Sequence, residues 1–226
     1  MSVQASAELL TARHERGQPV FAWPGRAHMQ RALACALRGS ALFAVVYDGA
    51  DLVARLHSHR LSSYLPVDDA IPLVPQATLL YSSLWLMFAM VPFVLRRDHE
   101  VRWLTRVIQI EIAIAGVFFL AAPMPDRPPA GDLGTFAAAF RAADAVNLEF
   151  NQFPSLHAAF GFTLAWALSA TCGPTRRVFL IAWSLAIAAA AVLTWQHAVL
   201  DVVGGAVLAA GVLSFVRRED RDENGR

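Results

Sequence analysis

The chain has 226 residues, of which 56% are hydrophobic and only 16% are charged. A water-soluble domain of this length has a more polar composition, so the composition excludes an ordinary soluble enzyme. The formal net charge is +1, and we expect membrane lipids rather than nucleic acid as partners. All 19 basic residues are arginines, and this lysine-free, alanine-rich composition favours a bacterial source.

Apolar runs follow one another along the chain after a polar N-terminal segment. Residues 1–32 carry charges but no apolar core of the signal-peptide type, so we expect a retained cytoplasmic tail. Residues 33–216 form the predicted membrane domain, and residues 217–226 form a short charged cytoplasmic tail. A spanning run must cross roughly 30 Å of hydrocarbon. Six runs qualify and predict an all-α fold, a six-transmembrane-helix bundle: 33–53, 71–95, 103–122, 156–172, 178–196 and 197–216.

The first of these runs is the weakest. Arg38, Asp48 and Asp51 interrupt it, so on hydropathy alone it fits an interfacial helix as well as a spanning one. We favour the spanning interpretation. Removing this span would invert the orientation of the rest of the chain.

The arginines are distributed unequally between the two sides that six spans create. Thirteen lie on the side of the two termini and four on the opposite side. Because positively charged loops stay in the cytoplasm, both termini are predicted to be cytoplasmic, in a multi-pass protein of the inner (plasma) membrane. His157 opens the fourth run and His197 lies where the fifth meets the sixth, so both are predicted to lie at the external face.

The long connection at 123–155 is rich in proline, glycine and aspartate. Long loops in compact domains are usually functional or disordered. This loop leads directly into Pro154-Ser155-Leu156-His157, so we interpret it as an external active-site loop. Cys35 and Cys172 show no CxxC or Cys/His spacing, so we expect no disulfide, no metal site and no cofactor.

The strongest chemical signal is the pair His197 and Asp201. Residues four apart on one helix lie over each other on the same face, so the carboxylate can hold one ring nitrogen of the histidine. The other nitrogen is then unprotonated and can attack phosphorus. An ionisable residue inside a span is costly unless it is paired or functional. Gly204 and Gly205 follow, and we interpret them as positions where another helix approaches closely.

Ser155 and His157 lie at the predicted start of the fourth span. Free backbone N–H groups and the helix dipole favour an anion such as phosphate at that position. Ser155 can donate a hydrogen bond to a phosphoryl oxygen, and His157 can protonate a leaving oxygen. Arg127, in the preceding loop, offers a forked donor suited to phosphate.

These residues resemble the type 2 phosphatidic acid phosphatase superfamily. Its three signature regions read Lys-x6-Arg-Pro, Pro-Ser-Gly-His and Ser-Arg-x5-His-x3-Asp. Arg127-Pro128 is similar to the end of the first region, and Pro154 to His157 is similar to the second, with Leu156 in place of glycine. His197 and Asp201 are similar to the end of the third. The Phe-Pro-Ser-Leu-His form, with Asn151 upstream and Gln196 before the second histidine, most resembles the inositol phosphorylceramide synthase branch and its bacterial relatives.

The resemblance implies a metal-independent lipid phosphatase or head-group phosphotransferase whose substrate is a lipid phosphate. It makes His197 the nucleophile that forms a phosphohistidine, Asp201 its orienting partner and His157 the general acid. Ser155, Arg127 and Asn151 are the implied phosphate ligands. The chain departs from the family pattern, because the first-region lysine and the third-region serine and arginine fall at Leu120, Ala190 and Ala191. Arg141, Arg38 and Arg106 are candidates to replace the two missing cations.

Several of these residues also have a purely structural interpretation. A single interfacial histidine is more often a polar anchor than a catalyst; the joint pattern with Asp201 favours catalysis. Ser155 can cap the helix, and Arg127 can pair with Asp126. Glu111, inside the third run, can meet Arg38 from the first.

Two other classes of function stay open. The first is a non-catalytic lipid-binding or transport protein on the same bundle. The second is a haem cytochrome with the two histidines as axial ligands.

Overall fold

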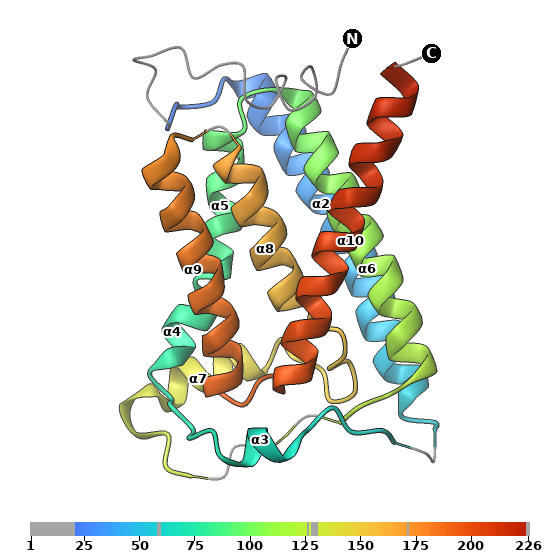
Figure 1. The fold of residues 1–226 in the computed structure, drawn as a ribbon, viewed down its shortest axis with the longest axis vertical. Coiled ribbons are helices and arrows are strands. Elements are labelled where there is room, and N and C mark those ends of the chain that lie inside the picture. The colour runs from blue at the N-terminus through green and yellow to red at the C-terminus, as the bar shows by residue number, and fades with distance from the viewer. Residues whose placement is uncertain (1–20, 58–59, 126, 128–130, 171, 225–226) are drawn as a thin grey trace.

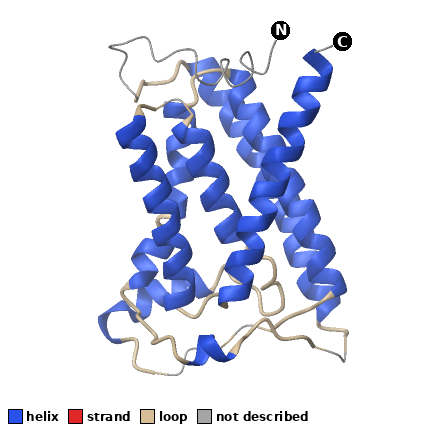
Figure 2. Ribbon diagram, in the orientation of Figure 1, coloured by secondary structure: helices blue, strands red, loops and turns tan. Residues whose placement is uncertain are grey.

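The protein is described by a computed structural model that covers residues 21–57, 60–125, 127, 131–170 and 172–224. Within these residues the regular elements are helices and no strand is present (Figure 2). The all-α prediction is confirmed. The predicted N-terminal tail lies largely outside the described residues, whereas the last helix continues through most of the predicted C-terminal tail. The elements are α2 (Arg26–Ala54), α3 (Pro66–Asp69), α4 (Ala77–Ser82), α5 (Leu84–Val94), α6 (Asp98–Ala121), η1 (Gly134–Phe136), α7 (Ala137–Asp144), α8 (Leu156–Ser169), α9 (Pro174–Leu193) and α10 (Val199–Asn224).

Five helical segments of the described chain are long and apolar enough to cross a membrane. They correspond to five of the six predicted runs. The fourth run forms α8, which has only 14 residues and therefore a length of about 21 Å, less than the hydrocarbon thickness. The five segments are Arg26–Ala54, Pro75–Val94, Asp98–Ala121, Pro174–Leu193 and Val199–Arg217.

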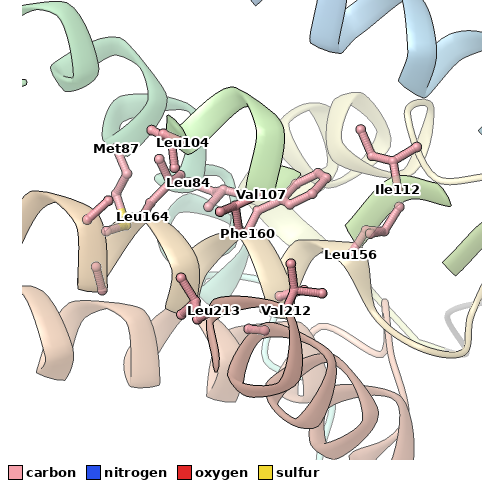
Figure 3. Close-up of a cluster of buried hydrophobic side chains, with 14 of the residues drawn as sticks. Leu84, Met87, Leu104, Val107, Ile112, Leu156, Phe160, Leu164, Val212 and Leu213 are labelled. Atoms are coloured by element: carbon pink, nitrogen blue, oxygen red, sulfur yellow. The ribbon is translucent and has the colours of Figure 1, made fainter. Parts of the chain in front are cut away.

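The short helix α8 lies in the middle of the bundle (Figure 1). Its side chains are mostly apolar all around the helix, and most of its residues are buried. Both features are expected of a helix surrounded by other helices. Figure 3 shows Leu156, Phe160 and Leu164 of α8 among side chains of α5, α6 and α10. Because neighbouring helices cover it, α8 does not need the length that contact with lipid would require.

Helix α2 carries the charges that weakened the first predicted run. Arg38 and Asp48 are exposed, whereas Asp51 is buried. One oxygen of Asp51 accepts from Nε of Arg55 at 2.9 Å, and the other accepts from the backbone N–H of Phe150 at 3.2 Å. A buried carboxylate is tolerated when it is paired in this way. Asp51, one of the charges that interrupt the first predicted run, therefore links α2 to the loop before α8.

Helix α6 contains the buried carboxylate of Glu111. Its Oε1 accepts from the hydroxyl of Thr163 on α8, whereas Oε2 has no partner among the described residues. The expectation that Glu111 meets Arg38 is wrong. Arg38 is exposed on α2, and Glu111 faces α8.

The connections place one end of α8 beside one end of α10. α8 and α10 begin, and α9 ends, at the end of the bundle opposite the N-terminal end of α2 (Figure 1). A side chain on Gly205 would place its Cβ 2.3 Å from the carbonyl oxygen of Ser155, and one on Gly204 would meet the ring of Phe153 at 2.4 Å. The interpretation of these glycines as close-packing positions is confirmed.

We expect Gly205→Ala to lower the free energy of unfolding by about 1–3 kcal/mol, because the clash is with backbone that cannot rotate away. Gly211→Ala in the same helix is the matched control, since a Cβ at Gly211 meets nothing within 4 Å. Thermal unfolding of both variants in one detergent measures the difference. Equal melting temperatures for the two variants would contradict the close approach.

Candidate active site

The first turn of α8 is fixed to the first turn of α10. Ser155 is the N-cap residue of α8, and its Oγ accepts from the backbone N–H of Ala158 at 3.2 Å. Its own backbone N–H donates to the carbonyl of Asp201 at 3.0 Å. Ser155 is fully buried, so its observed role is that of a helix cap. Its role as a phosphate ligand stays a prediction.

The pair His197 and Asp201 is brought together at the start of α10. The helix begins at Val199, so His197 lies in the preceding turn rather than on the helix itself. The reason is that Asp201 Oδ2 accepts from the backbone N–H of Ala198 at 2.8 Å and caps the helix there. Nδ1 of His197 nevertheless lies 3.8 Å from Oδ2 of Asp201.

Both members of this pair are buried, with exposed fractions of 5% for His197 and 0% for Asp201. Nδ1 of the histidine and Oδ1 of the aspartate have no hydrogen-bond partner among the described residues. A buried polar atom without a partner is costly, so a small rotation that closes the gap to hydrogen-bond distance is favourable. Catalytic hydrogen bonds are often long before substrate binds.

His157 lies in the first turn of α8 and contacts α4. Its Nε2 is 2.8 Å from the backbone oxygen of Tyr81, and its ring stacks on the Tyr81 ring with centroids 3.7 Å apart. His157 lies two residues after Ser155, whose backbone N–H donates to Asp201. The turns that carry the two histidines, 40 positions apart in the chain, are therefore joined directly.

Arg127 contacts Trp195, which precedes His197 by two positions in the chain. Its guanidinium lies 4.0 Å from the centre of the Trp195 ring, a cation–π contact. The same group donates to the backbone oxygen of Asp68 at 3.3 Å and lies 3.5 Å from a carboxylate oxygen of Asp69. Asp126 and Pro128 lie outside the described residues. Arg127 therefore lies beside Trp195, and its Nη1 is directed at Asp68 and Asp69 of α3.

Asn151 is placed differently from the other predicted ligands. Asn151 is buried, and its Nδ2 donates to the backbone oxygen of Tyr47 on α2 at 2.6 Å. Its Oδ1 has no partner among the described residues. The structure therefore shows Asn151 as an anchor between α2 and the loop before α8, and phosphate binding by Asn151 stays a prediction.

The candidates for the missing cations are separated by their depth in the bundle. Arg38 lies 16 residues from the end of α2 that is near the site, and Arg106 lies 15 residues from that end of α6. At 1.5 Å per residue, they lie about 24 Å and about 22 Å along their helices from those ends. Arg141, on α7, is exposed at the end of the bundle that holds the site. Of the three arginines, Arg141 is thus the one that lies at the end of the bundle that holds the candidate site.

Asp68 is a residue of the site that sequence reasoning missed. It is buried in the short helix α3, and its Oδ1 accepts from the backbone N–H of Val199, the first residue of α10, at 2.8 Å. Its Oδ2 accepts from the backbone N–H of Leu65 at 2.8 Å. A carboxylate at a helix N-terminus is stabilised by the helix dipole. No local pattern identifies it, because the helix that it caps begins 131 residues later.

No group of three or more His, Cys, Asp or Glu side chains that could hold a metal ion is found in the part of the chain that the structure describes. The ionisable groups at the candidate site include two imidazoles, the buried carboxylates of Asp68 and Asp201, and the guanidinium of Arg127. This set suits proton transfer and nucleophilic attack on a phosphoryl group.

Comparison with known proteins gives one match. The sequence model of the PAP2 superfamily matches residues 111–223, which is half of the chain. This range contains the site residues on α8, on α10 and in the loop before α8. No curated protein and no solved structure matches the chain significantly.

We expect Asp68→Ala to lower the free energy of unfolding by about 1–3 kcal/mol, because two backbone N–H groups lose their acceptor in a buried position. Asp69→Ala is the matched control. Its side chain is 79% exposed, and exposed ion pairs contribute little. Thermal unfolding in detergent compares the two. A larger loss for Asp69→Ala would contradict the capping role of Asp68.

Proposed function

Because the chain belongs to the PAP2 superfamily, we propose that it is a membrane enzyme that cleaves or transfers the phosphoryl-type group of a lipid phosphate through a phosphohistidine. Members of this superfamily are typically phosphatases or phosphotransferases. The observation that carries the proposal is the site itself. His157 lies in the first turn of α8, the pair His197 and Asp201 lies at the start of α10, and the hydrogen bond from Ser155 to Asp201 joins these two turns.

The proposed reaction has two steps. His197 attacks phosphorus, so a nitrogen–phosphorus bond forms while the bond from phosphorus to the leaving oxygen breaks. Asp201 stabilises the imidazolium through Nδ1–H, and His157 donates a proton to the leaving oxygen. In the second step the oxygen of water or of an alcohol attacks phosphorus, the nitrogen–phosphorus bond breaks to release His197, and the proton of the attacking oxygen passes to His157.

The acceptor in the second step decides between phosphatase and phosphotransferase. The Phe153–His157 segment and Gln196 resemble the inositol phosphorylceramide synthase branch. This resemblance supports transfer to an alcohol such as inositol. Hydrolysis uses the same first step, so both outcomes fit one site.

The phosphate ligands in this proposal are Ser155, Arg127 and Asn151, with Arg141 as an added cation. Arg127 is best placed, because it contacts Trp195, which precedes His197 by two positions in the chain. Its contacts with Asp68 and Asp69 are weak enough, at 3.3 and 3.5 Å, for a phosphate to replace them.

We expect His197→Ala to abolish turnover of phosphatidic acid in detergent with EDTA, because the nucleophile is lost. Asp201→Asn should lower kcat by roughly 10²–10⁴-fold, since the imidazole loses its orienting carboxylate. Release of phosphate and formation of lipid product are measured with and without inositol. A labelled donor should leave an acid-labile, alkali-stable label on the wild-type protein.

Arg38→Ala is the control for these variants, because Arg38 is exposed and about 24 Å along α2 from the end near the site. Retained turnover in His197→Ala would contradict the mechanism. A wild-type protein that binds phosphatidic acid but turns over no donor in a panel of lipid phosphates would favour the lipid-binding or transport alternative. Ligation of haem by both histidines would be seen as a Soret band in the purified protein.

We also propose that α8 completes a six-span topology, with both termini in the cytoplasm of a bacterial cell and the site at the external face of the plasma membrane. The positive-inside distribution of arginines supports this orientation. The position of α8 in the middle of the bundle supports counting it as the sixth span, because its neighbours separate it from lipid.

In cells, we expect a membrane-impermeant maleimide to label Val146→Cys and not Thr175→Cys, because the two exposed positions lie at opposite ends of the bundle. The native Cys35 and Cys172 are replaced by alanine in both variants. Permeabilised cells provide the control in which both positions react. The reverse labelling pattern would contradict the proposed orientation.

A further inference from the structure

The second spanning segment is interrupted beside the candidate site. It is divided at Ser83 into α4 and α5. The hydroxyl of Ser83 donates to the backbone oxygen of Leu80 at 2.6 Å and accepts from Nε1 of Trp183 on α9 at 2.8 Å. Breaks in long helices arise where side chains compete for the backbone. At this cap the Tyr81 carbonyl accepts a backbone N–H, and its second lone pair can accept from another donor.

The Tyr81 carbonyl is the partner of His157. Nε2 of the imidazole lies 2.8 Å from the Tyr81 oxygen. A carbonyl oxygen has only lone pairs to offer, so Nε2 must carry the hydrogen of this bond. In the neutral ring the lone pair is then on Nδ1, and in the charged ring Nδ1 carries the second proton. Proton exchange with a substrate therefore has to take place at Nδ1.

The side chain of Tyr81 holds the same imidazole from its flat face. The two rings are 7° from parallel, with centroids 3.7 Å apart. Tyr81 is itself fixed at its far end, because its hydroxyl donates to Oδ1 of Asn147 at 3.2 Å. The aromatic face that contacts His157 is therefore held rigidly.

Asn147 connects this arrangement to the second histidine. Its amide donates to Oε1 of Gln196, and Nε2 of Gln196 donates to Oδ1 of Asp144 at 3.2 Å. Every donor in this series points toward Asp144, the last residue of α7. Gln196 precedes His197 in the chain, so one set of hydrogen bonds orders the surroundings of both imidazoles.

We propose that Tyr81 is a positioning residue that fixes His157 in the Nε2–H tautomer, so that His157 gives and recovers its proton through Nδ1. This inference rests on the proposed function, because it names the atom that carries the proton in that reaction. In the first step the proton on Nδ1 passes to the leaving oxygen as its bond to phosphorus breaks. In the second step Nδ1 accepts the proton of the attacking water or alcohol.

The tautomer is tested directly by nitrogen NMR of the full chain with ¹⁵N-labelled histidine in lipid nanodiscs. His157→Gln identifies the His157 signals by their loss. At alkaline pH, where imidazoles are neutral, we expect the His157 signals of a single Nε2–H tautomer. An Nδ1–H tautomer, or an even mixture of the two, would overturn the proposal. This readout does not depend on turnover.

The positioning role is tested with Tyr81→Leu and two phosphate esters. A lipid phosphate has an alkoxide leaving group that needs a proton, whereas a nitrophenyl phosphate has a leaving group that departs without one. We expect Tyr81→Leu to lower kcat for the lipid on the order of tenfold or more, because a misplaced His157 loses part of the rate enhancement of a general acid. We expect kcat for the nitrophenyl ester to change much less.

Phe88→Leu is the matched control, because Phe88 lies in the same spanning segment and contacts Phe160 rather than His157. A change in packing alone would lower turnover of both esters equally. Equal losses in Tyr81→Leu would therefore overturn the positioning role. If wild-type protein turned over neither ester, the proposed function would fail, and the NMR measurement would still decide the tautomer.

Discussion

Gly205 has no side chain, and this absence lets the first turn of α8 lie directly against the first turn of α10. At that contact the backbone N–H of Ser155 donates to the carbonyl of Asp201. Each of the two turns carries one half of the candidate catalytic chemistry, with His157 on α8 and Asp201 on α10. A side chain at position 205 would clash with the backbone of Ser155, so the candidate site depends on this close approach.

The end of the bundle that holds the site is built from backbone groups satisfied by distant side chains. A bilayer offers no water to free N–H and C=O groups, so each loop at membrane depth needs internal partners. Asp51 accepts from the loop before α8, and Asp68 accepts from the start of α10. The Tyr81 carbonyl, beside the break at Ser83, accepts a backbone N–H at the cap and binds His157 as well. Residues that look unfavourable in an apolar sequence therefore have defined structural roles.

Much of the architecture was predictable because its signals are local. Hydropathy located the spanning helices, and the spacing of His197 and Asp201 indicated a paired imidazole and carboxylate. The N-cap role of Ser155 could also be proposed from its position before an apolar run. The prediction placed His197 on the helix, whereas the structure begins the helix at Val199, because the Asp201 carboxylate caps the preceding turn. Helix α7 was not expected either, although its alanine-rich sequence favours a helix.

The rest of the site could not be predicted because its partners are far apart in the chain. Tyr81 and His157 are 76 positions apart, and nothing near Tyr81 indicates that its carbonyl is available. Arg127 was identified by its motif, but its partners Trp195 and Asp69 follow only from the way the loops cross. The sequence by itself determined the helical membrane fold, the family and the two histidines with their aspartate, because periodicity and motif spacing are properties of short segments. Only the tertiary structure decided which donors and acceptors face those residues, because that depends on how separate helices and loops meet in space.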